Sequence, residues 1–322
     1  MSGNCNFLMD EVNVTYLIFE GHVELKKYRY LYFMLVFIVY ILIICSNSTI
    51  VYLIWKHPNL HEPMYIFIAA LLMNSVLHST NIYPKLLIDF LSEKQITSYQ
   101  ACLVQYFLFY VLVDSEFLLL TAMAYDRYVS ICKPLQYPTI MRKQTINILL
   151  ALAWIYPACH FVALTTICAN EKLCSFTLKV IFCNNTFLKL FCATPRALSV
   201  LGVITLFNNV GVPVFFIIYT YTRILKICYR SSAEVRKKAA QTCLPHLLLI
   251  INHFILLTYD VIIVRLEYDF PKAARLIMTL PLVVYNPLFN PIVYGLKMKE
   301  ILNISRGCFV NRKLSNVTHI NL

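Results

Sequence analysis

The stretch Met123-Ala-Tyr-Asp-Arg-Tyr-Val-Ser-Ile-Cys132 ends a long apolar segment of the chain and places Asp126 directly beside Arg127. Read alone, this pair would fit an ordinary cation that extends from a helix end toward the lipid headgroups. An arginine at the edge of a membrane is costly unless it is paired, and the adjacent carboxylate supplies a partner. Cys102 lies 25 residues before Arg127, which is about 37 Å along an α-helix. The two residues are therefore expected near opposite faces of one membrane-spanning helix.

The composition of the whole chain favours several such helices. Of its 322 residues, 59% are apolar and 14% are charged, against about 45–50% and 25% in ordinary soluble domains. A membrane helix needs about 20 apolar residues. We therefore predict an all-α bundle of seven transmembrane helices, at about 31–55, 64–90, 102–130, 144–167, 198–225, 240–263 and 273–295. This bundle, residues 31–296, would follow a leader at 1–30 and precede a tail at 297–322 that begins with a short amphipathic helix.

The net charge of +12 is spread between the apolar segments rather than gathered in one soluble part. That distribution favours loops attracted to an anionic lipid leaflet over a nucleic-acid partner. With the N-terminus outside, the loops on the inner side carry 16 of the 28 lysines and arginines. The excess of inner cations predicts an extracellular N-terminus and a cytoplasmic C-terminus. The first span is expected to act as an uncleaved signal anchor, because a polar leader precedes it.

Four further motifs stand in order along the chain: Leu60-His-Glu-Pro-Met-Tyr65, Pro84-Lys85, Lys238-Ala-Ala-Gln-Thr-Cys-Leu-Pro-His246 and Pro287-Leu-Phe-Asn-Pro-Ile-Val-Tyr294. Together with the stretch that ends at Cys132, they resemble the signature motifs of odorant receptors, which are rhodopsin-like G-protein-coupled receptors. The residues of these motifs resemble those of the fish-type odorant receptors most. The resemblance implies a seven-helix plasma-membrane receptor that is not an enzyme and needs no cofactor or metal. Such a receptor binds a small, polar odorant in its outer half and activates a heterotrimeric G protein of the stimulatory, cAMP-raising type.

The resemblance also assigns roles to individual residues at the inner end of the bundle. The residues expected to serve G-protein coupling and activation are Asp126, Arg127, Tyr128, Tyr221, Asn290, Pro291 and Tyr294. For Tyr221 and Tyr294 the alternative is that they are aromatic anchors near the membrane interface.

Asn47, Ser75 and Glu116 are expected to form a polar core inside the bundle. Ser75 stands where many members of the family carry Asp, so a sodium site with two carboxylates is not supported. Glu116 could form a reduced sodium site with Asn47, Ser75 and Asn290, or it could be protonated and only hydrogen-bonded. We favour the second reading, because a lone buried carboxylate tends to be neutral.

Asp114 is the most distinctive acid of the apolar segments. It shares a helix face with Tyr110 by four-residue spacing, and in the receptor fold a face of this helix lines the ligand cavity. We expect Asp114 near the cavity floor, about 18 Å along the helix from Cys102, as an anchor for an odorant with a donor or a positive group. The alternative is a second member of the polar core around Glu116. The expected ligand-binding residues are Phe109, Tyr110, Val113, Asp114 and Phe254.

Four of the 12 cysteines fall in the loop before the fifth span, at Cys168, Cys174, Cys183 and Cys192. Their spacing lacks the close pairs of a zinc site, and an outer loop favours disulfides. The resemblance pairs Cys102 with Cys183 and Cys174 with Cys192. Cys168 could then replace Cys174, pair with Cys5 or stay free.

Two kinds of covalent modification can be read from the sequence. Asn13 begins an N-glycosylation sequon on the leader and is the expected acceptor, whereas the sequon at Asn184 adjoins a disulfide cysteine and is not favoured. Cys308 in the tail is a palmitoylation candidate, with a free thiol as the alternative.

Two other classes of protein compete with a receptor. A membrane transporter or channel is the main alternative, but it would need polar residues along several spans. A membrane enzyme would need a cluster of catalytic side chains. The sequence reading places His246 and His253 on different sides of one helix, without partners, and so gives no such cluster.

Overall fold

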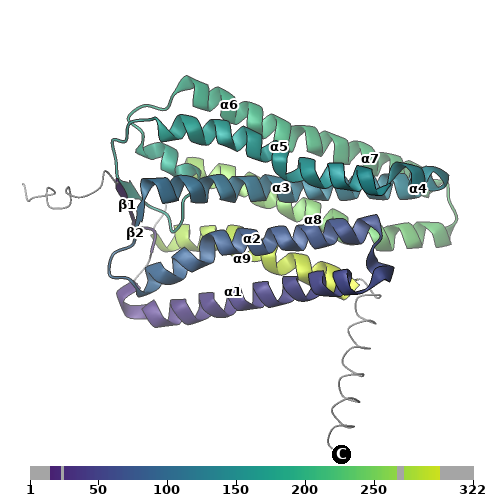
Figure 1. Cartoon of the computed structure of the whole chain (residues 1–322), viewed down its shortest axis with the longest axis horizontal. Helices are drawn as coiled ribbons and strands as arrows, with labels where there is room; N and C mark the ends of the chain where they lie inside the picture. The colour runs from purple at the N-terminus through teal and green to yellow at the C-terminus, as the bar shows by residue number, and fades with distance from the viewer. Residues whose placement is uncertain (1–14, 23–24, 267–271, 298–322) are drawn as a thin grey trace, which may run out of the picture.

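The computed structural model describes residues 15–22, 25–266 and 272–297, which form an elongated bundle of helices (Figure 1). The helices that run its length are α1 (Leu25–Lys56), α2 (Pro63–Leu91), α3 (Tyr99–Cys132), α5 (Lys143–Ala169), α6 (Arg196–Leu206) with α7 (Val212–Tyr229), α8 (Ala233–Leu266) and α9 (Lys272–Lys297). The expected all-α, seven-helix bundle is confirmed, with α6 and α7 forming one span. Among the described residues, five spans are long and apolar enough to cross a membrane, and α8 adds a shorter apolar stretch, Cys243–Thr258.

Several helices extend beyond the apolar runs that predicted them. The first begins at Leu25 instead of about residue 31, and the sixth begins at Ala233 instead of about residue 240. An apolar run marks only the part of a helix that lies in the hydrocarbon core of a membrane. The helix can continue into the polar residues on either side of that run. Short elements join the helices: η1 (Pro58–Leu60), η2 (Pro134–Gln136), α4 (Tyr137–Ile140) and η3 (Asn185–Leu190).

The fifth span is not the continuous α-helix that the sequence predicted. A π-helical turn, η4 (Phe207–Gly211), separates α6 from α7. Pro213 has no N–H and cannot donate to the carbonyl of Asn209 four residues earlier, so the regular helical ladder is interrupted at this place. The wider turn also lets the Asn209 side chain, which is fully buried, point toward α3.

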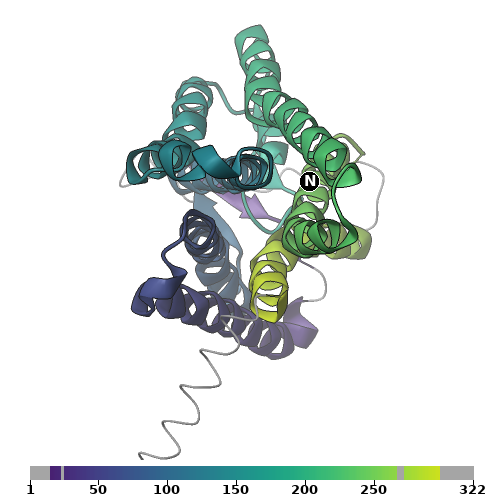
Figure 2. The ribbon, with the colours of Figure 1, turned by 90° about the vertical axis from the view of Figure 1, so that its right-hand side faces the viewer.

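α3 lies at the centre of the bundle and contacts α2, α5, α7 and α8 (Figure 2). One junction is made by Asn74 of α2, which donates to the carbonyl oxygen of Leu112 at 2.8 Å and accepts from the Trp154 indole at 3.1 Å. Large apolar side chains on the outer faces of α1, α5, α6 and α7 are exposed. Such faces are compatible with lipid as their solvent, whereas a water-soluble protein would cover them.

A small sheet closes one end of the bundle, called here the sheet end. Its strand order is β2 (Ile96–Ser98), β1 (Tyr16–Phe19), β3 (Thr177–Leu178); β1 pairs antiparallel with β2 and parallel with β3. In Figure 2, seen from the opposite end, the purple strand β1 lies across the middle of the far end. Leu17 and Phe19 of β1 are buried there. The sequence reading treated residues 1–30 only as a leader and did not anticipate that part of it forms a cap.

The opposite end, called here the Arg127 end, carries α4 and the last turns of α3 and α7. Asn13, the amphipathic helix expected after residue 297, Cys5 and Cys308 lie outside the described residues.

Candidate ligand-binding site

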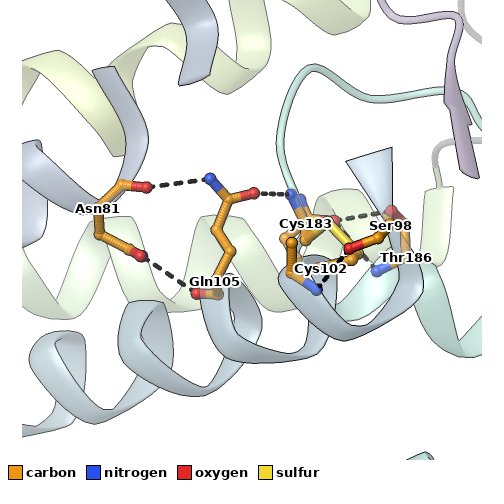
Figure 3. Close-up of a disulfide and its surroundings, with 8 residues drawn as sticks. Asn81, Ser98, Cys102, Gln105, Cys183 and Thr186 are labelled. Carbon is orange, nitrogen blue, oxygen red and sulfur yellow. Dashed lines mark hydrogen bonds between the residues drawn. A yellow bond between two sulfur atoms is a disulfide. The ribbon is translucent and has the colours of Figure 1, made fainter. Parts of the chain in front are cut away.

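The loop between α5 and α6 is fixed at the sheet end by a disulfide to α3. Cys102 and Cys183 are joined with their Cα atoms 5.4 Å apart. Gln105, one turn along α3, accepts a hydrogen bond from the Cys183 backbone N–H at 2.9 Å and donates to the Asn81 carbonyl of α2 at 3.0 Å (Figure 3). The loop is therefore attached to α3 by the disulfide and by the Gln105 side chain, which also connects α3 to α2.

A second disulfide, Cys174–Cys192, closes the loop on itself, with a Cα–Cα distance of 4.8 Å. These are the two pairs that the resemblance implied. Cys168 is free and buried at the end of α5, and its carbonyl oxygen accepts from the Tyr99 hydroxyl at 2.5 Å. Of the three possibilities left open for Cys168, the structure shows the free thiol.

A cavity of about 650 Å³ lies below this loop. Tyr106, Tyr110 and Asp114 line it from α3, and Phe161 lines it from α5. The remaining walls come from the loop, from α6 and η4, and from α8, which contributes Phe254, Leu257 and Thr258. Its volume is in the range of pockets that hold small organic ligands, about 300–1,000 Å³.

The structure brings together only part of the expected ligand-binding set. Tyr110, Asp114 and Phe254 line the cavity. Phe109 and Val113 instead line a separate space of about 20 Å³, together with Glu116 and His253. Residues 109 and 113 lie on a different face of α3 from residues 110 and 114, because neighbouring positions on a helix are about 100° apart.

Asp114 is held by a partner that the sequence reading missed. The Asn209 amide donates to Asp114 Oδ2 at 2.7 Å, and Asn209 Oδ1 lies 2.9 Å from Nδ1 of His160 on α5. The chain Asp114–Asn209–His160 thus crosses from α3 through η4 to α5. It is separate from the hydrogen bonds around Glu116. A sequence signal was available, since Asn208 and Asn209 interrupt an apolar segment just before Pro213.

The polar core forms around Asn290 of α9. Its amide nitrogen donates to Ser75 Oγ at 3.0 Å and to Glu116 Oε1 at 2.8 Å. Asn47 also contacts α9, where it donates to the Pro287 carbonyl at 2.9 Å, but it makes no hydrogen bond to Glu116 within the described residues.

This core does not fit a sodium ion. Asn290 turns its N–H donors, not an oxygen, toward both Ser75 and Glu116. His253 Nδ1 lies 3.8 Å from the same oxygen, Glu116 Oε1. A cation needs converging oxygen ligands, so the hydrogen-bonded reading of Glu116 agrees better with the geometry. The described residues also contain no cluster of three or more His, Cys, Asp or Glu side chains suited to a metal ion.

At the Arg127 end, Asp126 holds two groups at once. Its Oδ2 pairs with the Arg127 guanidinium, with the Nε contact at 3.0 Å, and its Oδ1 accepts from the Tyr137 hydroxyl of α4 at 2.8 Å. Burial, followed by the neighbouring Asp126 carboxylate, raises the pKa of Tyr137. The hydroxyl therefore stays protonated and remains a donor to Asp126.

The other residues expected to serve activation come from α3 itself and from α7 and α9. The Tyr128 ring of α3 lies beside that of Tyr219 of α7, at a centroid distance of 6.2 Å. The Tyr294 hydroxyl of α9 donates to Met123 Sδ at 3.7 Å, and Pro291 is buried one turn away. The Tyr221 hydroxyl lies 2.7 Å from His246 Nδ1. Tyr221 and Tyr294 are both buried, so their described positions are not those of aromatic anchors at a lipid interface.

The placement of His246 and His253 on different sides of α8 is wrong. Both side chains are buried and face the bundle. A spacing of seven residues is almost two full helical turns and puts both side chains on one face, so the numbering alone could have shown this. His246 joins Tyr221 to the Leu120 carbonyl of α3, which its Nε2 approaches to 2.9 Å. His253 lies 3.0 Å from the Asn286 amide and 3.8 Å from Glu116.

A second cavity, of about 450 Å³, opens between the last turns of α7 and the first turns of α8. Tyr221, Ile224 and Tyr229 line it from α7, and Arg236, Ala240 and Leu244 from α8. Tyr221, which lines this cavity, is also the residue that contacts His246.

Comparisons with known proteins agree with one another. The family model described as olfactory receptor matches residues 36–312. Human olfactory receptor 13C2 is 33% identical over 295 residues, covering 88% of this chain and 90% of that protein. Human olfactory receptor 2T27 is 31% identical over 278 residues, covering 85% and 87%. Mouse olfactory receptor 5H19 is 32% identical over 295 residues, covering 88% and 92%.

Among solved structures, squid rhodopsin is similar in fold, with a TM-score of 0.71 at 16% identity. The similarity covers 89% of this chain and 87% of the rhodopsin chain.

Proposed function

The chain belongs to the olfactory receptor family of G-protein-coupled receptors, and we propose that it binds a small, polar odorant in the cavity at its sheet end and activates a stimulatory G protein at its Arg127 end. Members of this family are receptors and not enzymes. The family assignment also stands against the transporter or channel alternative. Membership in the fish-type subgroup remains a prediction.

The single observation that carries the ligand half of the proposal is the cavity of about 650 Å³ that includes Tyr110, Asp114 and Phe254. It is largely apolar with a few polar groups, as small-molecule sites are. The loop above it is attached to α3 and α2 through Cys183 and Gln105. A wall fixed in this way keeps its shape before the ligand arrives, which lowers the entropy lost on binding.

The signalling half rests on contacts that hold the Arg127 end closed. Arg127 is paired with Asp126, and α8 is joined to α7 and α3 through His246. An outward movement of α8 would break the His246 contacts and widen the cavity between α7 and α8. A ligand produces that movement only if it binds the open state more tightly than the closed one.

The orientation that we propose places the sheet end outside the plasma membrane and the Arg127 end in the cytoplasm. Exposed cations gather near the Arg127 end, at Arg223, Lys226, Arg230, Arg236 and Lys237. Cytoplasmic loops are enriched in Lys and Arg, and the same cations suit an acidic G-protein surface and anionic lipid headgroups.

The proposal is tested by an odorant panel with a cAMP readout in cells that express the full chain. We expect at least one small odorant to raise cAMP in a saturable way, and Arg127→Ala to abolish the response at equal surface expression. Leu152→Ala is the matched control, because Leu152 is exposed on the outer face of α5 and takes part in none of the contacts described. A response that survives Arg127→Ala, or odorant-driven ion flux without cAMP, would overturn the proposal.

A further inference from the structure

Asp114 presents an unused carboxylate oxygen to the odorant cavity. The side chain is only 6% exposed, and Oδ2 accepts the Asn209 amide at 2.7 Å. Within the described residues, Oδ1 has no hydrogen-bond partner, although Asp114 belongs to the cavity wall. When a ligand displaces water from the cavity, a carboxylate oxygen that borders it loses its hydration, and a hydrogen bond that is not replaced costs free energy. A ligand group that donates to Oδ1 would remove that cost.

The orientation of this carboxyl group is set from outside the cavity. Asn209 approaches Asp114 from the π-helical turn, and its own Oδ1 is taken by His160. Because the Asn209 amide oxygen is already engaged, Asn209 offers Asp114 only its N–H donor. Neither Asn209 nor any other described residue provides an acceptor for a proton on Asp114. Burial of a lone carboxyl group favours the neutral acid, whereas the Asn209 N–H favours the ionised carboxylate, and an ammonium group beside Asp114 would favour it further.

No cation among the described residues of the cavity wall competes for that carboxylate. The described residues that line the cavity include no Lys, Arg or His. The other polar groups are hydroxyls and an amide, from Tyr106, Tyr110, Asn185, Thr205 and Thr258. Asp114 is therefore the one charge among the described lining residues, and it has the opposite sign to an ammonium group.

Aromatic rings stand one turn above the carboxylate. Tyr110 and Phe161 are stacked with ring centroids 5.5 Å apart, and Tyr106 lies 5.0 Å from Tyr110. The ring faces attract a cation and also pack an apolar body. The rest of the wall is aliphatic or aromatic, including Leu198, Phe207 and Leu257.

We infer that the odorant of this receptor is a protonated amine with an apolar alkyl or aromatic body, whose ammonium group pairs with Asp114 Oδ1 while Asn209 and His160 hold the carboxylate in place. Asp114 is the binding residue, and Asn209 and His160 are positioning residues. The inference deepens the proposed function and rests on it only for the cAMP readout.

The test uses odorant sets with one skeleton and different head groups: octylamine, 1-octanol and octanal, and 2-phenylethylamine with its alcohol and aldehyde. Primary amines are protonated at pH 7, as lysine is. In cells expressing the full chain, we expect an amine to act at concentrations at least tenfold lower than its neutral partners. Asp114→Asn should raise the EC50 of the amine by about 30-fold or more, the usual effect of removing one partner of a buried charge pair. The EC50 of the alcohol should change less than about threefold.

Two further variants separate charge from packing. Thr205→Val changes a hydroxyl in the same cavity wall without changing charge, and we expect it to affect amine and alcohol equally. His160→Phe should raise the EC50 of the amine only, and His160→Gln, which keeps a donor for Asn209, should restore part of the loss. If Asp114→Asn does not reach the cell surface, Asp114→Glu replaces it, with the carboxylate retained and the amine preference kept.

A second readout separates this inference from the proposed function. In purified receptor, octylamine or 2-phenylethylamine should raise the thermal unfolding midpoint, and Asp114→Asn should remove that shift. Amine stabilisation without any cAMP response would uphold the inference and overturn the proposed function. An Arg127-dependent response to neutral odorants alone, or no stabilisation by any amine, would overturn the inference.

Discussion

The Tyr221 hydroxyl of α7 lies 2.7 Å from Nδ1 of His246 on α8, and Nε2 of the same imidazole lies 2.9 Å from the Leu120 carbonyl of α3. One buried ring therefore joins three helices at the level where α8 would have to move. The contact exists in the arrangement described here, in which Arg127 is paired with Asp126. Its loss should weaken this closed arrangement relative to an open one.

We therefore expect His246→Leu to raise cAMP without odorant. A net contribution of about 1 kcal/mol from such hydrogen bonds corresponds to roughly fivefold in the closed-to-open ratio. Basal cAMP, normalised to surface expression, measures the effect. Leu248→Ala is the control, because Leu248 lies on α8 two residues away and is exposed. Unchanged or lower basal cAMP in well-expressed His246→Leu would contradict a closing role for His246.

The sequence predicted the helices better than the contacts between them. Apolar length alone located each span, because crossing a bilayer imposes a minimum run of apolar residues. The contacts depend on how each helix is rotated about its axis. Asp114 was singled out correctly as a cavity residue, but its partners Asn209 and His160 come from two later helices. The sequence of α3 alone does not determine which side chains of those helices will contact it.

Two other features were not predicted from the sequence: which residues share a face of α3, and a short strand near the N-terminus. Phe109 and Val113 were grouped with Tyr110 and Asp114 although they lie on another face of α3. The strand at 16–19 is too short to stand out in a polar leader, and it forms only because β2 and β3 offer free edges. Short strands of this kind are specified by tertiary pairing rather than by intrinsic preference.

The cap at the sheet end depends on one glycine. A Cβ atom at Gly21 would lie 2.6 Å from the carbonyl oxygen of Val180 and 2.7 Å from its Cα. Backbone atoms cannot move aside as a flexible side chain can, so Gly21→Ala should push the leader away from the outer loop. We expect a lower thermal unfolding midpoint for Gly21→Ala in purified receptor. Gly202→Ala is the matched control, because nothing lies within 4 Å of its Cβ position. Equal midpoints for the two variants would show that the leader tolerates displacement.

The sequon at Asn184 should not carry a glycan in the folded receptor. Asn184 is 4% exposed, and its Oδ1 accepts from both the backbone N–H and the hydroxyl of Thr186, at 3.1 and 2.7 Å. A glycan is attached to the amide nitrogen, and the burial of this side chain beside Cys183 leaves no space for it. We expect Asn13→Gln, but not Asn184→Gln, to remove the mobility shift that a glycosidase produces on a gel. A shift that persists in Asn13→Gln and disappears in Asn184→Gln would reverse the assignment.

The attachment of the leader should weaken in acid because of His22. Neither ring nitrogen of His22 has a partner within the described residues, and its ring meets Phe90 edge-on at a centroid distance of 5.7 Å. Burial, and secondarily the charge of Lys85, lowers the pKa of His22 to about 4 from an ordinary 6.5. The detached leader therefore binds a proton at a higher pH than the docked one does. Docking is most stable above pH 6.5, and its stability falls as the pH decreases from 6.5 toward 4. Between pH 7.5 and 5.0 the unfolding midpoint of the wild type should fall further than that of His22→Phe, which keeps the ring contact but cannot titrate. Parallel decreases in the two proteins would mean that His22 is not the titrating group, because every other ionisable side chain is common to both.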